Sequence, residues 1–434
     1  MAEKSKELIA KNVSSKNKNL PPHVVILGGG FAGLYAAKSL RKAPVRITLI
    51  DQKNHHLFQP LLYQVATAAL TAPDIASPIR KILKRSKNTT VLLGKAISIS
   101  PHEKKVILED GEFFFDYLIV AVGATHSYYG HPEWESYAPG LKTIEDAFEI
   151  RRRILLAFES AEKEEDPQKQ KEWLTFLVIG GGPTGVELAG ALAEIARHTM
   201  IRDFRRINPR DAKIILIEGV DRILPLYPKK LSEKAKEQLE DLGVKVYTNR
   251  VVTEINEKGV NIGENFTPAK TVIWSAGVIA SPILQKFGVP LDRSGRVLVN
   301  SDLTIPGHYS IFVVGDAAAL KQGDFWVPGI APAAIQEGKH AAKNILLALK
   351  EKDHEPFHYS DRGLLATIGR SKGVAYLGKV KFWGFWAWIL WLFVHIFFLI
   401  GFRNRFVVFF EWAWAYVTLQ RSARLILTKE TKSE

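Results

Sequence analysis

Short apolar runs, each ending at a glycine-rich turn and followed by an alanine-rich stretch, recur along this chain. Residues 23–27 lead into Gly28, and residues 176–179 lead into Gly180, 152 residues further on. Continuous apolar runs of this length, bounded by glycine, are typical of strands buried on both faces of a parallel sheet. Alanine-rich stretches favour helix. The pattern predicts an α/β fold built from two similar strand–turn–helix units.

Both turns have the spacing G-x-G-x-x-G. A glycine turn before a helix N-terminus binds pyrophosphate, because backbone N–H groups point at the anion and no Cβ blocks its approach. One copy is a weak signal, since ordinary α/β units also use tight glycine turns. Two copies predict two bound dinucleotides, with electrons passing between them. The glycines are Gly28, Gly30 and Gly33 in the first turn and Gly180, Gly182 and Gly185 in the second.

Each unit continues into a second apolar strand that ends in an acidic residue. Asp51 follows residues 46–50, and Glu218 follows residues 213–217. A carboxylate at this position can accept hydrogen bonds from the ribose hydroxyls of an adenosine. Glu218 would repel a 2′-phosphate, which favours NAD over NADP, although Arg222 lies close enough in sequence to weaken that inference.

Three later strands end in small residues, as expected where backbone lies close to a cofactor. Residues 115–125 include Gly123, and residues 271–277 end at Gly277. Both units therefore contain an apolar strand that runs into a glycine turn, which supports an internal repeat. A further strand runs into Asp316, before a predicted helix of small residues. Asp316 is expected to accept a cofactor hydroxyl there, and the alternative is that it caps that helix.

The C-terminal part is unusually aromatic. Residues 382–402 contain no Asp, Glu, Lys or Arg, and ten of these 21 residues are Trp or Phe. A helix of this length could span roughly 30 Å of hydrocarbon at about 1.5 Å per residue. Tryptophan throughout the first half instead favours a helix that lies in the headgroup region. The basic break at 403–405 and the aromatic run 406–416 predict a second such helix, followed by Arg421, Arg424 and Lys429. The alternatives are a spanning helix and a helix buried between domains or in a dimer.

Composition narrows the class of protein. With 434 residues the chain has room for two or three domains. Cysteine is absent, which excludes disulfides, cysteine-held iron–sulfur clusters and a redox-active cysteine pair. The net charge of +14 favours an anionic partner, and without a nucleic-acid motif we expect membrane lipid rather than nucleic acid. Residues 1–21 are expected to be a disordered basic segment without a secretory signal, and a weak organellar address stays an alternative.

With these features in place, the chain resembles the type II NADH:quinone oxidoreductases, which are single-subunit respiratory flavoenzymes that do not pump protons. The resemblance runs from Val24 to about Leu427. It rests on the paired glycine turns, on the Gly-Asp pair at Asp316 and on the aromatic C-terminal segment. It also rests on residues 329–336, which lie where the family has its A-Q-x-A-x-Q quinone motif.

The resemblance implies an FAD domain that is split by an inserted NADH domain, followed by amphipathic membrane-anchor helices. The boundaries that follow for this chain are 22–140 for the first part of the FAD domain, 141–172 for a helical connector, 173–295 for the NADH domain, 296–350 for the second part of the FAD domain and 351–434 for the anchoring region.

The resemblance also implies which residues bind the cofactors. The FAD residues would be Gly28, Gly30, Phe31, Ala32, Gly33, Asp51, Ala96, Gly123, Asp316, Ala333 and Ala334. The NADH residues would be Gly180, Gly182, Gly185, Glu218 and Gly277.

The resemblance implies that two residues take part in catalysis. Glu187 corresponds to a family acid that lies between the nicotinamide and flavin regions and takes part in the proton supply to quinone; otherwise it is simply a favourable acid in a first helical turn. The first Gln of the quinone motif is Pro332 here. Proline offers no side-chain hydrogen bond and no N–H, so its role would pass to Gln336 or to water.

The implied reaction is hydride transfer from NADH to FAD and transfer of two electrons to a membrane quinone, with ubiquinone and menaquinone both open. No metal is required, and His55, His56 and His395 are expected to have surface or packing roles. The implied state is a homodimer, attached peripherally to the cytoplasmic face of the inner or plasma membrane if the source is bacterial. Two rivals stay open: an NADH-dependent reductase of a small electron-carrier protein, and a nucleotide-binding sensor or scaffold without turnover.

Overall fold

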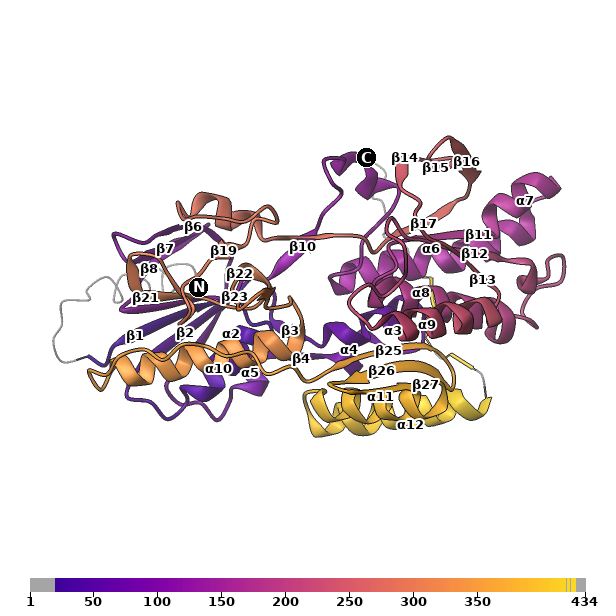
Figure 1. The fold of residues 1–434 in the computed structure, drawn as a ribbon. Coiled ribbons are helices and arrows are strands. Elements are labelled where there is room, and N and C mark those ends of the chain that lie inside the picture. The colour runs from indigo at the N-terminus through magenta and orange to yellow at the C-terminus, as the bar shows by residue number, and fades with distance from the viewer. Residues whose placement is uncertain (1–19, 419, 422, 427–434) are drawn as a thin grey trace. The chain divides into compact units, whose positions relative to one another are not determined.

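The computed structural model describes residues 20–418, 420–421 and 423–426, and the chain divides into two compact units. Unit 1 comprises the chain up to residue 57, residues 77–125 and residues 278–361. Unit 2 comprises residues 58–76, residues 126–277 and the chain from residue 362. Figure 1 labels their helices and strands. Most of the predicted N-terminal segment 1–21, and Lys429, lie outside the described residues.

A six-stranded sheet forms the centre of unit 1. In spatial order its strands are β20 (Thr304–Ile305), β21 (His308–Val313), β9 (Tyr117–Val120), β1 (His23–Leu27), β2 (Arg46–Asp51) and β5 (Thr89–Leu93). Neighbours pair in parallel, except that β20 is antiparallel to β21. Because β21 returns to this sheet after the long intervening segment of unit 2, the prediction of a domain split by an inserted one is confirmed.

Two helices of unit 1 pack closely against each other. They are α2 (Phe31–Ser39), which follows the first glycine turn, and α10 (Ala331–Ala348). A Cβ on Gly338 would lie 2.1 Å from the carbonyl oxygen of Ala32, so only glycine permits this approach. The sequence region that carries the quinone motif is therefore held directly against the first glycine helix.

The remaining elements of unit 1 are short. Helical segments are α5 (Ile79–Ile82), η5 (Pro282–Lys286) and η6 (Gly315–Ala317). Strands are β3 (His55–Leu57), β4 (Ala76–Pro78), β6 (Ala96–Ser100), β7 (Lys105–Leu108), β8 (Gly111–Phe114), β10 (Ala124–His126), β18 (Val278–Ala280), β19 (Val297–Leu298), β22 (Ala318–Ala319), β23 (Lys321–Gln322) and β24 (Phe325–Trp326). β4 and β10 each reach across a unit boundary.

Unit 2 has its own parallel sheet. The order is β13 (Val244–Tyr247), β12 (Lys213–Ile217), β11 (Thr175–Ile179) and β17 (Thr271–Trp274), with β11 leading into the second glycine turn. An antiparallel sheet of β14 (Val252–Asn256), β15 (Gly259–Ile262) and β16 (Asn265–Pro268) adds to it. Apolar residues of both sheets share one core.

The helices of unit 2 come from distant parts of the sequence. They are η1 (Gln59–Leu61), α3 (Leu62–Ala66), α4 (Ala72–Ile75), η2 (Pro132–Ser136), α6 (Ile144–Lys163), α7 (Pro167–Trp173), α8 (Pro183–Glu194), a π-helical turn (Ile195–Thr199), η4 (Pro209–Asp211) and α9 (Lys229–Asp241). The helical connector predicted at 141–172 is represented by α6 and α7.

The C-terminal part begins with an antiparallel sheet of β25 (Leu364–Gly369), β26 (Lys372–Leu377) and β27 (Val380–Trp383). β25 lies against α8, and a Cβ on Gly190 would lie 1.7 Å from the carbonyl oxygen of Ile368. This close approach brings the C-terminal sheet onto the helix that follows the second glycine turn.

The prediction of one helix over 382–402 is wrong at its start and at its end. The first residues belong to β27, and Gly384, at a φ of +72°, turns the chain into α11 (Phe385–Phe398). Gly401, at a φ of +97°, separates α11 from α12 (Phe402–Thr418). Positive φ is open to glycine at little cost, so these two residues set the limits of α11.

The basic break predicted at 403–405 lies inside α12 instead of between the helices. Asn404 donates hydrogen bonds to the carbonyl oxygens of Pro73 and Asp74, both at 3.0 Å. Arg405 donates to the carbonyl oxygens of Leu399 and Phe397, both at 2.7 Å. These polar residues satisfy backbone acceptors at the end of α11 and near α4, so they join elements rather than interrupt them.

No helix within the described residues is both long and apolar enough to cross a bilayer. Both aromatic helices carry side chains exposed to solvent. The exposed side chains include Trp386, Phe393 and Phe397 on α11 and Phe409 and Trp414 on α12. The opposite side packs inward, with Trp391 buried on α11 and Val408 buried on α12.

The unit boundaries differ from the predicted domain limits on both sides of the inserted domain. Residues 58–76 belong to unit 2, because buried Arg151 of α6 donates to the carbonyl oxygens of Val65 and Leu70. Residues 126–140 also belong to unit 2, where the Tyr128 hydroxyl donates to the carbonyl oxygen of Ala138 at 2.9 Å.

Two other segments belong to unit 1 instead of the domains predicted for them. Residues 278–295 place Leu284 and Phe287 in the core of unit 1. Residues 351–361 return to the same unit, where the N–H of Phe357 donates to the carbonyl oxygen of Ser301 at 2.7 Å. Burial of large apolar side chains therefore decides these limits, whereas the linker signals in the sequence do not.

The helix predicted directly after Asp316 is also different. Asp316 lies in a single 3-10 turn, η6, which is followed by the short strand β22. The next helix is α10, which begins fifteen residues later at Ala331. Asp316 therefore caps no long helix, and a phosphate at a helix N-terminus beside it would have to use α10.

Candidate functional site

The first glycine turn leaves open space at one glycine only. Gly28 has a φ of +100°, and its Cβ would lie 2.2 Å from the carbonyl oxygen of Ala121. A Cβ on Gly33 would lie 1.9 Å from the carbonyl oxygen of Gly28. A Cβ on Gly30 would meet no atom within 4 Å. Two glycines are thus required by packing, and the third leaves room for a ligand to approach the backbone.

The second turn repeats this division of roles. Gly180 has a φ of +106°, and its Cβ would lie 2.6 Å from the amide nitrogen of Ala276. A Cβ on Gly185 would lie 1.8 Å from the carbonyl oxygen of Gly180, whereas a Cβ on Gly182 would meet nothing within 4 Å. The equivalence of Gly30 and Gly182 supports the same kind of ligand at both turns.

The predicted acidic partners reach their turns. Asp51 accepts a hydrogen bond from the N–H of Gly29 at 2.5 Å, and Glu218 accepts one from the N–H of Gly181 at 2.6 Å. Burial raises the pKa of the Asp51 carboxyl, against the effect of its backbone hydrogen bonds. A carboxylate has about four acceptor sites, so each residue keeps capacity for a ribose hydroxyl.

Several residues predicted for FAD gather around the first turn. The position of a Cβ on Gly315 is 3.4 Å from the Cβ of Ala32 and 3.5 Å from the Cβ of Ala334. Asp316 lies close to Gly329, just before α10, with 3.4 Å from its Oδ1 to the position of a Gly329 Cβ. Gly123 has a φ of +70° and open space in place of its side chain. Ala333 is buried in the first turn of α10.

Two titratable residues that sequence reasoning did not assign to this region complete it. His56 is buried; its Nδ1 hydrogen-bonds to the carbonyl oxygen of Gly29 at 3.0 Å, and its Nε2 has no partner. Burial lowers the pKa of His56 to about 4, so the ring is neutral. Glu337 is buried and accepts the N–H of Gly315; burial raises the pKa of this carboxyl to about 8.

The residues present therefore fit a dinucleotide such as FAD. The open position at Gly30, the unpaired Nε2 of buried His56 and the N–H groups at the start of α10 are features that a bound polar ligand would satisfy. Phe31 packs edge-on against His56, with ring centroids 4.9 Å apart. Ala96 begins β6, two residues after Gly94, whose N–H donates to the carbonyl oxygen of Asp51.

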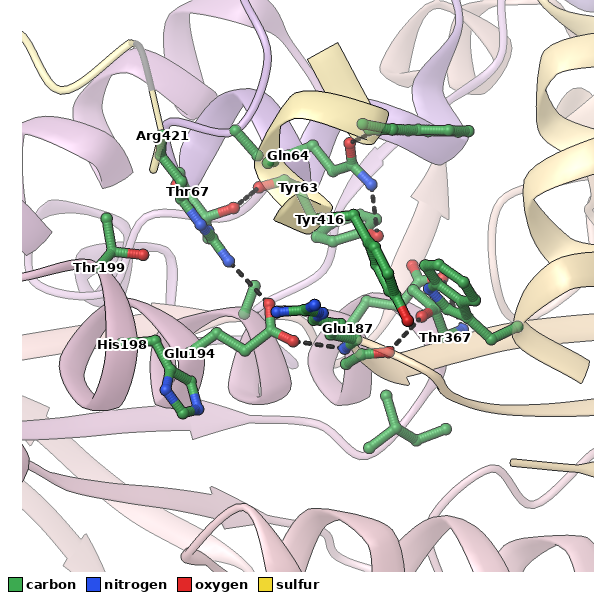
Figure 2. Close-up of a pocket in the computed structure, with 18 of the residues that line it drawn as sticks. Tyr63, Gln64, Thr67, Glu187, Glu194, His198, Thr199, Thr367, Tyr416 and Arg421 are labelled. Carbon is green, nitrogen blue, oxygen red and sulfur yellow. Dashed lines mark hydrogen bonds and ion pairs between the residues drawn. The ribbon is translucent and has the colours of Figure 1, made fainter. Parts of the chain in front are cut away.

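Unit 2 also contains a pocket of about 310 Å³ beside α8 (Figure 2). Its walls come from α3, α8, the π-helical turn, the end of β25, α11 and α12. The apolar wall includes Trp388, Trp391, Leu392 and Trp412. The polar groups in Figure 2 include Tyr63, Gln64, Glu187, Glu194 and Arg421.

Glu187 lines this pocket and is buried, 8% exposed. Burial raises the pKa of its carboxyl to about 8, and the weaker effects of the Thr367 N–H and the Trp391 indole oppose this rise. The hydrogen bond from the Thr367 N–H is long, at 3.5 Å. At neutral pH the neutral acid predominates, so Glu187 holds a proton that it can donate.

Glu194 lies two helical turns further along α8 and also lines the pocket (Figure 2). One of its oxygens accepts a hydrogen bond from Arg421 at 3.0 Å, and the other accepts the N–H of Arg370. Arg421 also donates to the carbonyl oxygen of Thr67 at 2.8 Å. This ion pair holds the chain after α12 against α8 and the end of α3, where Arg421 forms part of the pocket wall.

Gln336 belongs to unit 1, whereas Glu187 belongs to unit 2. Its Nε2 donates to the carbonyl oxygens of Pro332 at 3.2 Å and Ser360 at 3.0 Å, and its Oε1 accepts the N–H of Ser360 at 3.0 Å. The amide is thus already engaged within its unit. Its quinone role stays a prediction, and these hydrogen bonds would have to break for it.

Gly277 has a φ of +77°, and its Cβ would lie 2.6 Å from the hydroxyl oxygen of exposed Tyr129. This glycine therefore lets Tyr129 lie over the end of β17, a placement that the sequence did not reveal. No cluster of three or more metal-ligating side chains occurs within the part of the chain that the structure describes.

Sequence reasoning missed Tyr63, Gln64 and Trp412 altogether. Trp412 donates its indole N–H to Oε1 of Gln64 at 2.7 Å, and Nε2 of Gln64 donates to the Tyr63 hydroxyl at 2.9 Å. Tyr63 and Gln64 are neighbours on α3, whereas Trp412 lies 348 residues after Gln64, on α12. The aromatic run around Trp412 was a signal for membrane contact, and nothing in it indicated an inward hydrogen bond.

Comparison with known proteins gives one consistent result. The pyridine nucleotide-disulphide oxidoreductase family matches residues 22–338. The type II NADH:quinone oxidoreductases Ndh and NdhA of Mycobacterium tuberculosis are 41% and 42% identical to this chain, over 94% of it and 90% and 89% of their own lengths. The type II NADH:quinone oxidoreductase of Staphylococcus aureus is 31% identical, over 81% of this chain and 88% of its own.

Solved structures share the fold. The structure of NDH2 from Plasmodium falciparum in complex with NADH covers 94% of this chain with a TM-score of 0.85 and 21% identity, and the match covers 100% of that chain. The sulfide:quinone oxidoreductase of Aquifex aeolicus covers 88% of this chain and 92% of its own, with a TM-score of 0.72 and 20% identity. At these identities the likeness concerns the fold.

Proposed function

The chain belongs to the pyridine nucleotide-disulphide oxidoreductase family and, within it, to the type II NADH:quinone oxidoreductases, and on this premise we propose that the pocket around Glu187 is where quinone is reduced. NADH and quinone are the substrates, and FAD is the cofactor of the family. The observation that carries the site assignment is a buried carboxyl, protonated at neutral pH, in a pocket with aromatic walls.

The first glycine turn is assigned to FAD and the second to NADH. Gly30 and Gly182 are the points of closest backbone approach to each pyrophosphate, and Asp51 and Glu218 accept the ribose hydroxyls. The support is the open space at both glycines and the position of each carboxylate at its turn. Bound FAD supplies the two-electron chemistry that joins NADH oxidation to quinone reduction.

The chain's own residues supply position and protons. Reducing a quinone to a quinol takes two electrons and two protons, whereas NADH provides two electrons and one proton as hydride. One proton for each turnover must therefore come from water. Glu187 lines the pocket and holds its proton at pH 7, so it gives a proton to a quinone oxygen and is then reprotonated from water.

Use of a membrane quinone and association with a membrane follow from the family. We assign the membrane contact to the exposed aromatic faces of α11 and α12. The support is that Trp386 is 71% and Phe393 is 70% exposed, and that Arg403 of α12 is exposed as well. Attachment to the cytoplasmic face of a bacterial membrane and a homodimeric state are part of this proposal.

The first experiment follows the visible absorbance of bound flavin under anaerobic conditions. NADH is added first, and ubiquinone and menaquinone analogues follow in separate runs, with NADPH as the control. Bleaching by NADH and recovery with a quinone support the assignment and identify the quinone. Bleaching without recovery by either quinone would instead support the alternative function, reduction of a small electron-carrier protein.

The membrane proposal is tested in the full chain. The variant W386S/F393S/W414S removes exposed rings and leaves buried Trp391 in place. We expect weaker co-sedimentation with anionic vesicles, because burying one such side chain is worth about 1.5–3 kcal/mol. Reduction of a water-soluble quinone analogue should be unchanged. Vesicle binding equal to that of the unmodified protein would remove these faces from the contact.

A further inference from the structure

The pocket beside Glu187 contains hydrogen-bond donors that the protein itself leaves without acceptors. The first comes from a chain of three side chains that begins on α12. An indole N–H can only donate, so the contact at 2.7 Å from Trp412 fixes Oε1 of Gln64 toward α12. The amide nitrogen of Gln64 must then face Tyr63, to which it donates at 2.9 Å.

This order decides where the Tyr63 hydroxyl proton points. The Tyr63 oxygen already accepts a hydrogen bond from Gln64, so its own O–H has to donate elsewhere. No described residue accepts it, and Tyr63 lines the pocket. Burial and the charge of Glu187 keep the pKa of Tyr63 well above its usual value, so the hydroxyl retains its proton. The Tyr63 hydroxyl is therefore a hydrogen-bond donor that a ligand in the pocket can satisfy.

A second donor has the same character. Trp391 is 1% exposed, lines the pocket, and its Nε1 has no hydrogen-bond partner. The ring is held by stacking on His395, with centroids 4.0 Å apart, and Nδ1 of His395 is 2.7 Å from the carbonyl oxygen of Trp391. The Trp391 N–H is directed at the Glu187 carboxyl and opposes the rise in its pKa, without forming a hydrogen bond of normal geometry. A quinone oxygen beside Glu187 would therefore compete with that carboxyl for this donor.

We propose that Tyr63 and Trp391 are hydrogen-bond donors to the quinone, with Tyr63 set in place by Gln64 and Trp412 and Trp391 held by His395. This inference rests on the proposed function of the pocket. A buried donor without an acceptor is costly, and a carbonyl oxygen is an acceptor only, so the two groups complement each other. Trp412 and Gln64 act through Tyr63 and are positioning residues.

The donors also suit the reaction. As two electrons from NADH reach the quinone, its two C=O groups become C–O groups that carry negative charge, and two protons convert them into C–OH. Tyr63 and Trp391 keep their protons and stabilise the developing charge. Glu187 supplies the one proton that comes from water, and the second proton is the equivalent of the one that NADH delivered with its hydride. Donors that are already oriented need no rearrangement when the charge appears.

The main test compares Tyr63→Phe with Tyr128→Phe. Both remove a buried tyrosine hydroxyl from unit 2, but Tyr128 does not line the pocket and donates to the carbonyl oxygen of Ala138. Removing one donor to a developing oxyanion typically costs about 10²–10³-fold in rate, and a neutral hydrogen bond less, so we expect about a 10–100-fold lower kcat/KM for quinone in Tyr63→Phe. Tyr128→Phe should leave it unchanged.

Bleaching of the flavin by NADH is measured in the same variants and should stay at the level of the unmodified protein. Equal kcat/KM for quinone in Tyr63→Phe and the unmodified protein would overturn the inference while the proposed function stands. If the unmodified protein itself does not reduce quinone, the proposed function fails first. Melting temperatures identify a variant that loses activity because it unfolds.

The positioning role has a separate readout. Trp412→Phe frees the Gln64 amide to turn, so we expect a decrease of about 3–10-fold in kcat/KM for quinone, as for loss of one neutral hydrogen bond. The same substitution in the Tyr63→Phe background should have almost no effect, because the two residues act in one chain. Additive effects of the two substitutions would contradict the chain.

A spectroscopic measurement separates donation from general packing. Infrared spectra of a bound, carbonyl-labelled quinone report hydrogen bonding to its oxygen. We expect the labelled C=O band to lie at lower frequency in the unmodified protein than in water-free solvent, and to rise in Tyr63→Phe and in Trp391→Phe. A band that stays in place in both variants would overturn the inference whatever the rates show.

Discussion

The helices α2 and α8 begin from almost the same glycine turn, yet the fifth residue after the open glycine has different surroundings in the two helices. Two residues after the last glycine, α2 carries Tyr35 and α8 carries Glu187. Tyr35 is half-buried, with the ammonium groups of Lys38 and Lys339 5.0 and 5.4 Å from its ring centroid. Glu187 is buried beside a pocket. The two glycine turns are alike, but only α8 places an acidic side chain beside a pocket.

The difference comes from what packs on each helix. α10 lies against α2, whereas β25 and α3 lie against α8. β25 approaches α8 closely at Gly190, and the N–H of Thr367 from that strand reaches Glu187. A duplicated dinucleotide fold thus acquires a proton donor through later segments of the chain, while its nucleotide turn is left unchanged.

The largest effect on quinone reduction is expected when Glu187, the residue that distinguishes α8 from α2, is replaced. Glu187→Gln keeps the shape but loses the acid, so we expect quinone reduction to decrease by about 100-fold, within the usual range for a general acid. Bleaching of flavin by NADH should remain. Tyr35→Phe, at the equivalent position of α2, is the matched control and should leave quinone reduction unchanged.

The role of Glu187 as proton donor also predicts how quinone reduction depends on pH. Because the pKa of Glu187 is about 8, quinone reduction should decrease as pH rises through about 8 in the unmodified protein. Glu187→Gln should lack this step. An unchanged pH profile in the variant would assign the proton to another group.

The second prediction concerns stability. The pKa of Glu187 is raised from its ordinary value of 4.5 to about 8 in the folded chain, so the folded state binds the extra proton between these values. Stability contributed by this group is therefore lost as pH rises from 4.5 to about 8, at ~1.4 kcal/mol per pH unit at most. Glu187→Gln should gain stability relative to the unmodified protein over this range in denaturant titrations.

The third prediction separates the glycines within each turn. Gly28→Ala and Gly180→Ala place a Cβ 2.2 and 2.6 Å from backbone atoms at positive φ, so each should destabilise the fold by about 2 kcal/mol or more. Gly30→Ala and Gly182→Ala have open space and should stay within about 0.5 kcal/mol. Thermal melts of the protein without added ligand check both pairs.

The open glycines should instead affect the cofactors separately. Gly30→Ala should weaken FAD retention, and Gly182→Ala should raise the KM for NADH by about 10-fold with FAD retained, as for a loss of about 1.4 kcal/mol. Flavin content after gel filtration and NADH kinetics distinguish the two. Loss of FAD in Gly182→Ala would contradict the assignment of the second turn to NADH.

The smallest effects are expected at the acidic partners. Asp51→Asn and Glu218→Gln keep an acceptor oxygen, so each should weaken its nucleotide by only a few-fold, in line with about 1 kcal/mol for a hydrogen bond. Glu218→Gln should also reduce the discrimination against NADPH, because the repulsion of a 2′-phosphate is removed. Competition between NADH and NADPH measures this change.

Much of the nucleotide-binding framework could be predicted from the sequence. The runs before Gly28 and Gly180 and the acids at Asp51 and Glu218 predicted their strands, turns and partners, and the structure brings each acid to its turn. Local residue preferences decide such features, because a turn at a φ near +100° leaves little choice but glycine.

The helix limits in the C-terminal part could not be predicted in the same way. Residues 382–383 are as aromatic as those of α11, yet they pair with β26 in an antiparallel sheet. The polar Asn404 ended the predicted helix, but it hydrogen-bonds to the backbone near α4 and lies within α12. Partners more than 300 residues away in sequence overrode the local pattern.

The sequence by itself determined the duplicated nucleotide fold, the position of Glu187 on the second glycine helix and the family to which the chain belongs. Only the tertiary structure decided that this acid is buried and protonated, that Trp412 orients Tyr63 through Gln64, and that Gln336 is engaged with Ser360. Local conformation follows from neighbouring residues, whereas a pKa and a donor's direction depend on desolvation and on partners brought together by folding.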